Sequence, residues 1–166
     1  MLEDVASRLG CGVAHTAAMI RSRPWRKPAA RHMPAALLAA VATEIGLRTI
    51  RLRTLARILG VPLALDDQDP GRPAHPQELP ADGAARYRAA QCLMQVWPFG
   101  GEGKCLRMSL VAGCLLRRHA PTVRLGIARL DQGIAAHAWI VVDGLIVDHD
   151  ARLFIPLAPP VAPHSA

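Results

Sequence analysis

Aromatic residues are scarce in this chain, and closely spaced cysteines are missing. Of its 166 residues, 4% are aromatic and 4 are cysteine. The cysteines form no C-x-x-C motif and are too few for a disulfide scaffold, so we expect free thiols in a reducing, cytoplasmic setting. Few aromatics stand among the basic residues, so the net charge of +7 predicts a solvated basic surface and no nucleic-acid site.

Long hydrophobic runs are also missing. The longest, Pro34 to Val41, is far shorter than the roughly 20 residues that a membrane-spanning helix requires. Glu3 and Asp4 lie where a signal peptide carries positive charge, and no sustained apolar segment follows them. We therefore expect neither membrane insertion nor secretion. The segment 100–104 lacks the spacing of a phosphate-binding loop, and we expect no cofactor.

The patterns along the chain divide it into four regions. Residues 1–65 are predicted to form a helical N-terminal region, 66–83 a linker or loop rich in proline and glycine, 84–158 the core, and 159–166 a tail. The longest predicted helix runs from about Pro34 to Leu59, is bent or divided at Gly46, and stops at Gly60. Its arginines are predicted to lie opposite one broad buried face. That face comprises Leu37, Leu38, Val41, Ile45, Ile50, Leu52, Leu55 and Ile58.

The core is predicted to contain helices followed by a small antiparallel sheet. One helix runs from Ala84 to about Trp97, and a second opens at Cys105. A strand over 123–130 precedes a hairpin of 137–142 and 145–148 around the turn residues Asp143 and Gly144. This order predicts an α+β fold in which the second helix packs on the sheet.

Cys105 and His137 are the candidate catalytic pair. A cysteine at a helix N-terminus meets unpaired backbone N–H groups and the positive end of the helix dipole, and both favour thiolate over thiol. A histidine on a facing strand supplies the acid and base that a thiol nucleophile requires. Cys92 and Cys114 lack this setting and are interpreted as small hydrophobic residues.

The register of the hairpin predicts which acid orients His137. If Asp143 and Gly144 form a two-residue turn, continued pairing places Asp150 directly opposite His137, where its carboxylate can accept the Nδ1 proton. A shift of one residue in register would instead favour Asp148 by diagonal reach. Asp150 is the first choice and Asp148 the alternative, and a site without either acid stays open.

Other side chains have competing interpretations. Trp139 either lines the substrate groove or belongs to the core. Gln91 and Gln95 are candidates for a second oxyanion donor beside the Cys105 N–H, and a surface role is the simpler interpretation. A zinc site formed by Cys105 with nearby histidines and an aspartate lacks a tight ligand pair, so we expect no metal.

Five segments of the predicted core carry a resemblance to a known family. They are Lys104–Leu110, Leu115–His119, Val123–Arg129, Ala136–Trp139 and Val142–Gly144. In these segments the chain resembles the lasso-peptide maturation proteases, which are transglutaminase-like B proteins. The resemblance spans roughly 84–158, and the helical segment 34–62 also resembles their N-terminal part. It implies N-terminal helices followed by a transglutaminase/papain-like core, with Cys105 and His137 as the family's catalytic cysteine and histidine. An ungapped comparison places the family's aspartate at His149, between Asp148 and Asp150.

The resemblance also implies a function and partners. It implies a cysteine peptidase that removes the leader from a ribosomally made precursor peptide, together with a separate leader-binding protein and an asparagine-synthetase-like cyclase. The alternative is a non-catalytic transglutaminase-like protein that binds peptide or serves as a scaffold in the same complex. A peptide transglutaminase or an amidase is a further enzymatic interpretation.

Overall fold

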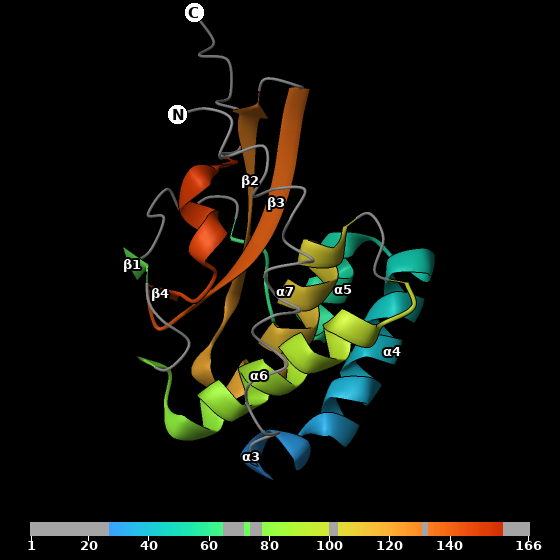
Figure 1. The fold of residues 1–166 in the computed structure, drawn as a ribbon. Coiled ribbons are helices and arrows are strands. Elements are labelled where there is room, and N and C mark those ends of the chain that lie inside the picture. The colour runs from blue at the N-terminus through green and yellow to red at the C-terminus, as the bar shows by residue number, and fades with distance from the viewer. Residues whose placement is uncertain (1–26, 65–71, 74–77, 100–102, 131–132, 158–166) are drawn as a thin grey trace, which may run out of the picture.

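The computed structural model describes residues 27–64, 72–73, 78–99, 103–130 and 133–157. Its elements form one α+β unit in which helices pack against one face of a curved sheet (Figure 1). The helices are α3 (Lys27–Ala30), α4 (Met33–Thr49), α5 (Leu52–Ile58), α6 (Ala81–Val96) and α7 (Lys104–Leu115). The predicted α+β class therefore holds.

The sheet has the strand order β1-β4-β3-β2-β5. Its strands are β1 (Arg72–Pro73), β2 (Thr122–Leu130), β3 (Gly133–Val142), β4 (Leu145–Ile146) and β5 (Ile155–Pro156). The long hairpin of β2 and β3 is its centre. One part of the antiparallel prediction is wrong, because β1, which lies in the predicted linker, pairs with β4 in parallel.

The turn between β3 and β4 forms as predicted. Asp143 and Gly144 have φ angles of 51° and 74°, as a two-residue type I′ turn requires, and Val142 pairs with Leu145. The expected continuation is wrong, because the ladder ends one pair later. The chain then leaves the sheet and forms the 3₁₀ helix η3 (His149–Leu153).

The long N-terminal helix divides four residues later than predicted. Gly46 lies inside α4, and the break comes at Ile50 and Arg51, which have extended backbone angles. Gly46 is needed for packing, because a Cβ at this position would lie 2.3 Å from the Leu55 side chain of α5. Gly60, with φ of 74°, follows the end of α5 as predicted.

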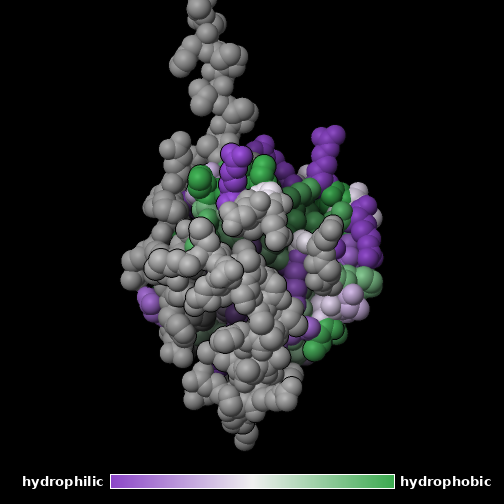
Figure 2. Space-filling view, turned by 45° about the horizontal axis from the view of Figure 1, so that its top comes forward, coloured by the Kyte–Doolittle hydropathy of each residue, from purple (hydrophilic) through white to green (hydrophobic). Residues whose placement is uncertain are grey.

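The buried face of α4 is the opposite of the predicted one. Small residues, including Ala36, Ala39 and Ala40, face the core together with Thr43 and Glu44. Their small size allows α6 and α7 to approach α4 closely, so these alanines occupy the buried positions. Leu37, Leu38, Val41 and Ile45 of the predicted face are exposed, whereas Leu55 of α5 is buried as predicted. Figure 2 shows hydrophobic and hydrophilic residues side by side along the edge of the molecule on which α4 lies in Figure 1.

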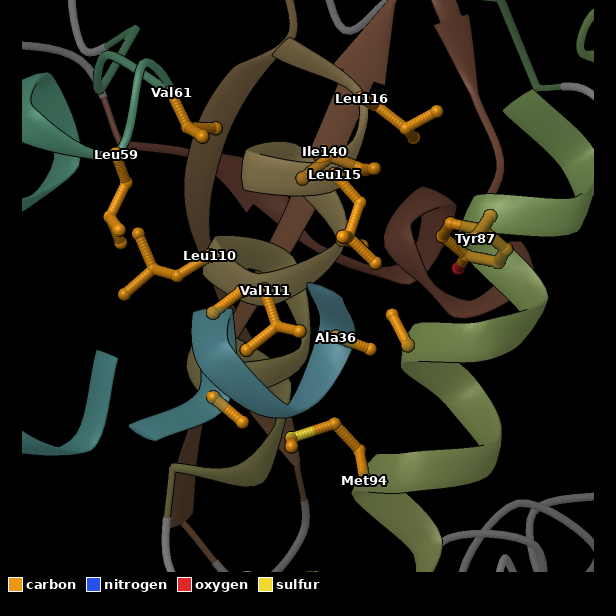
Figure 3. Packing of buried hydrophobic residues seen from close by; sticks show 14 of the residues in the cluster. Ala36, Leu59, Val61, Tyr87, Met94, Leu110, Val111, Leu115, Leu116 and Ile140 are labelled. Atoms are coloured by element: carbon orange, nitrogen blue, oxygen red, sulfur yellow. The ribbon is translucent and has the colours of Figure 1, made fainter. Parts of the chain in front are cut away.

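The main core lies between the helices and the sheet (Figure 3). Leu110, Val111 and Leu116 from the α7 region pack there with Tyr87 of α6 and Ile140 of β3. A second, smaller cluster on the other face of the sheet is formed by Trp139, Val141, Ile146 and Ala151, with Phe154 against it. Together the two clusters fix β3 between α7 and η3.

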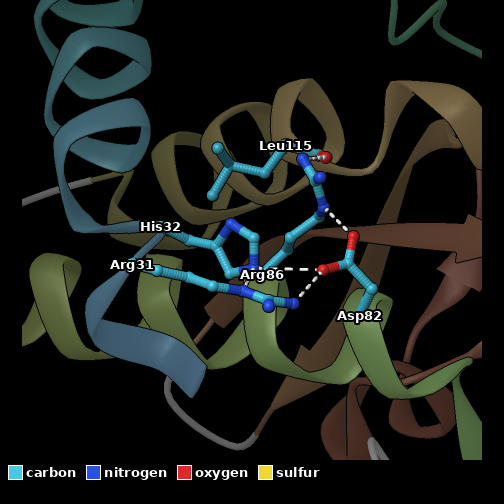
Figure 4. A network of polar contacts seen from close by, with 5 residues as sticks. All are labelled: Arg31, His32, Asp82, Arg86 and Leu115. Atoms are coloured by element: carbon cyan, nitrogen blue, oxygen red, sulfur yellow. Dashed lines mark hydrogen bonds and ion pairs between the residues drawn. The ribbon is translucent and has the colours of Figure 1, made fainter. Parts of the chain in front are cut away.

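An ion-pair network joins the start of α4 to α6 and the end of α7 (Figure 4). The Asp82 carboxylate accepts hydrogen bonds from Arg31 and from Arg86, both at 2.6 Å. Arg86 also donates to the Leu115 carbonyl at 3.3 Å. These contacts, chiefly that of Arg86, lower the pKa of Asp82 to about 2. The network fixes the helical layer at the end of α7 that is remote from Cys105.

Candidate active site

Cys105 lies in the first turn of α7. Gly103 precedes the helix with φ of 75°, a left-handed conformation that glycine adopts without strain. This turn brings the chain into α7 so that the Cys105 thiol is half-buried and lies beside β3. The position agrees with the predicted helix start.

His137 lies on β3 within hydrogen-bonding reach of the Cys105 thiol. Its Nε2 lies 2.7 Å from Oδ2 of Asp148. Because Nε2 is engaged by the carboxylate, Nδ1 is the nitrogen left for sulfur. The two ring nitrogens therefore have the reverse of the roles expected from the hairpin register.

Asp148 is the aspartate that the structure brings to His137, and Asp150 is not. Asp148 caps η3, where its Oδ1 accepts a hydrogen bond from the Asp150 backbone N–H at 3.0 Å. Asp150 is exposed and lies within η3, because the β3–β4 ladder ends before it can face His137. The His149 side chain lies outside the described atoms. The first choice of acid fails on geometry, and the alternative takes the position.

The His137 ring is held by aromatic neighbours. It stacks on Phe154 with ring centroids 4.8 Å apart and lies 6.2 Å from the Trp139 ring. Trp139 is only 1% exposed, so it belongs to the core and does not line a groove. Phe154 was not anticipated from the sequence, because it follows η3 and no local pattern links it to β3.

A buried hydrogen bond fixes α7 against β3. The Ser109 hydroxyl, one helical turn after Cys105, donates to the Ala138 carbonyl at 3.0 Å. Ala138 follows His137 directly, so this bond joins α7 to β3 next to both the thiol and the imidazole. Ser109 was missed from the sequence as well, because a serine in a helix carries no signal of its cross-strand partner.

The electrostatics favour an ion pair between thiolate and imidazolium. Burial raises the pKa of the Cys105 thiol, but hydrogen bonds from His137 and from the Ala138 and Leu106 backbone outweigh burial and lower the pKa. Burial likewise lowers the pKa of His137, yet its bonds to Asp148 and Cys105 raise the pKa to about 9. By contrast, burial raises the pKa of Cys114.

A second polar cluster joins the first turn of α7 to α4. Glu44 of α4 is 4% exposed, and its two carboxylate oxygens accept from Arg107 at 2.9 Å and from Arg48 at 2.8 Å. The Arg48 guanidinium lies 4.8 Å from the centre of the Phe99 ring, which contacts Trp97 edge to face. The cluster therefore holds Phe99 and the first turn of α7 against α4.

The two candidates for a second oxyanion donor lie on the surface of α6. Gln91 and Gln95 are exposed on α6. Within the described ranges, no group of three or more histidine, cysteine, aspartate or glutamate side chains is placed to hold a metal ion. No helix in the described part of the chain is both long and apolar enough to cross a membrane.

The thiol is hydrogen-bonded to the imidazole, and the imidazole is hydrogen-bonded to the carboxylate. This arrangement is suited to thiol-based acyl transfer and hydrolysis. The sequence model of the transglutaminase-like superfamily matches residues 41–154, a range that contains Cys105, His137 and Asp148. The chain belongs to this superfamily. No curated protein and no solved structure matches the chain significantly.

Proposed function

We propose that this protein is a cysteine peptidase that removes the leader from a lasso-peptide precursor, acting with a leader-binding protein and a cyclase. The observation that carries the proposal is the chain of hydrogen bonds from Cys105 through His137 to Asp148. The lowered pKa of the thiol and the raised pKa of the imidazole favour the charged pair that thiol peptidases use. A purely structural cysteine requires neither shift.

The proposed reaction uses each group in turn. The Cys105 thiolate attacks the scissile carbonyl carbon, and the Cys105 backbone N–H at the helix start donates to the oxyanion. The C–N bond then breaks as the His137 imidazolium gives its proton to the leaving amine. Neutral His137 next takes a proton from water, whose oxygen attacks the thioester, and the thiol leaves as thiolate. Asp148 stabilises the imidazolium throughout.

The edge of β3 supports an extended peptide as the substrate. Backbone groups alternate in direction along an antiparallel strand, and Val142 pairs with β4 next to the two-residue turn. Counting back from Val142, the backbone groups of Ala138, Ala136 and Ile134 are directed toward the same edge, away from β2. Ser109 takes the Ala138 carbonyl, whereas within the described residues no strand pairs with this edge at Ala136 or Ile134.

This edge adjoins the thiol, because the Ala138 N–H is also a hydrogen-bond donor to Cys105. A peptide that adds to it as a further strand would run past the sulfur with its backbone groups satisfied. Ala136 and Ile134 are both exposed, so the edge is accessible from solvent. We infer that main-chain pairing here would help to orient the leader–core junction.

Mass spectrometry of purified components tests the proposal. The precursor peptide and the leader-binding protein are incubated with the wild-type chain, with Cys105→Ala and with Cys114→Ala. We expect a single cleavage by the wild type and by the Cys114 variant, and none by the Cys105 variant. Cleavage that survives Cys105→Ala would remove the proposed nucleophile. An inactive wild type whose Cys105 shows no enhanced alkylation would favour the non-catalytic alternative.

A further inference from the structure

The outward face of α4 is apolar over three turns. Leu37, Leu38, Val41 and Ile45 are 47%, 72%, 43% and 57% exposed, respectively. The other exposed positions between Pro34 and Ile45 are alanine or proline, so the face carries no charge over this length. A surface helix of a monomeric protein ordinarily places polar residues on this side. An apolar face of this extent indicates an interaction surface.

The surroundings of this face are basic. Between Lys27 and Ala64 there are six basic residues and one acidic residue, Glu44, which is buried. Arg48 continues the face in the last turn of α4 with its side chain 59% exposed. Three further exposed arginines follow α4 directly or lie on α5. They are Arg51, Arg53 and Arg57.

We propose that the outer face of α4 binds an amphipathic helix of a partner protein, with leucine-like residues on its apolar side and carboxylates along its flanks. The apolar residues would fill the row from Leu37 to Ile45, and the carboxylates would meet the arginines at its end. Charge complementarity favours an acidic partner over a second copy of this chain, because the surroundings of the face are basic in both copies. Identification of the partner as the leader-binding protein rests on the proposed function.

The same helix connects this surface to the candidate active site. Its inner face presents Glu44 to Arg107, which lies two residues after Cys105. Arg48, at the end of the outer face, contacts both Glu44 and Phe99. A partner on α4 would therefore bind the helix whose inner face contacts the first turn of α7.

Fluorescence anisotropy with defined peptides tests this surface without any enzymatic step. The probe is a labelled amphipathic helix of about 20 residues with leucine on one face and glutamate on its flanks, and a second peptide carries lysine in place of glutamate. The variant is Leu38→Glu. The matched control is Ile155→Glu, since Ile155 of β5 is also 72% exposed and lies outside α4.

We expect the acidic peptide to bind the wild type and the Ile155 variant equally, and Leu38→Glu to weaken its binding at least about tenfold, as loss of one buried leucine implies. The lysine peptide should bind at least about tenfold more weakly than the acidic one. Equal binding of both peptides, or no binding of either, would overturn the proposal.

Two further measurements assign the face to another occupant if the proposal is wrong. Light scattering that finds a wild-type dimer and a monomeric Leu38→Glu would make it an interface between copies. Flotation with vesicles that contain anionic lipid, lost in Leu38→Glu, would make it a lipid-binding surface. Each result overturns the helix-docking proposal and does not bear on the proposed peptidase function. Iodoacetamide alkylation of Cys105, which tests the thiol alone, should be unchanged in Leu38→Glu.

Discussion

Asp148→Asn should weaken the thiolate–imidazolium pair while preserving the local shape. The amide side chain introduced by this change has nearly the same shape but only one oxygen, so it can cap η3 or accept from His137 but cannot do both as the two Asp148 oxygens do, and it lacks the negative charge. Asp148 is half-buried and its Oδ2 lies 2.7 Å from Nε2 of His137, so the lost charge acts at close range. Asp150→Asn is the matched control, since it removes an exposed carboxylate two residues away.

The expected size of the change in the His137 pKa follows from the shift of that pKa in the wild type. A rise in the pKa of His137 from 6.5 to about 9 corresponds to about 3 kcal/mol of added preference for imidazolium. Because Asp148 and Cys105 share this effect, about half of it, or about tenfold, is assigned to Asp148. Asp148→Asn should therefore lower the pKa of His137 and, through the pair, raise the pKa of Cys105.

The pH dependence has a defined sign. The folded-state pKa of His137 is raised, so the stability contributed by protonation of this histidine is fully present below pH 6.5 and is lost as the pH rises through about 9. The proposed cleavage requires the imidazolium, so its alkaline limit should lie near pH 9 in the wild type and at lower pH in Asp148→Asn. The alkylation rate of Cys105 near neutral pH should fall in the same variant, because its thiolate loses part of its stabilisation.

Iodoacetamide alkylation across pH and NMR titration of the His137 ring provide the measurements. Asp150→Asn should leave both profiles unchanged within about twofold, because mutation of an exposed carboxylate removes little interaction energy. A large loss in Asp150→Asn together with a normal Asp148→Asn would refute the assignment of the acid. Unaltered His137 titration in Asp148→Asn would refute the electrostatic reasoning even if the activity fell.

Two other predictions concern the framework of the site. Glu44→Gln should destabilise the fold by about 1–3 kcal/mol in urea unfolding, because Arg107 loses a buried charged partner. Since the pKa of Glu44 is lowered in the folded state, the difference in stability between wild type and variant should disappear as the pH falls below 4.5. A difference that stays constant down to acid pH would contradict this account. Gly113→Ala should cost about 1–3 kcal/mol, because its Cβ would lie 2.4 Å from a Val61 methyl. Gly83→Ala, whose Cβ would make ordinary contact at 3.4 Å, should be neutral or stabilising by up to about 1 kcal/mol, and equal costs at the two glycines would contradict the packing argument.

Several features of the fold could be predicted from local chemistry. Gly60 ends a helix and the Asp143–Gly144 pair forms a type I′ turn, because both depend on backbone angles that the residues themselves favour. Cys105 lies in the first turn of α7 for the same kind of reason, since Gly103 before the helix adopts the left-handed conformation without strain. The proximity of Cys105 and His137 was inferred from the order of helix and strand.

The sequence by itself therefore determined the class of the fold, the helix start at Cys105 and the histidine that lies beside it. Tertiary structure decided which aspartate meets His137, because the β3–β4 ladder ends early and η3 turns Asp148 toward the ring. It also decided which face of α4 is buried, since close helix packing selects alanine over leucine. In both cases the outcome depends on contacts with residues distant in the chain, and hydrophobic periodicity and turn propensity carry no record of those contacts.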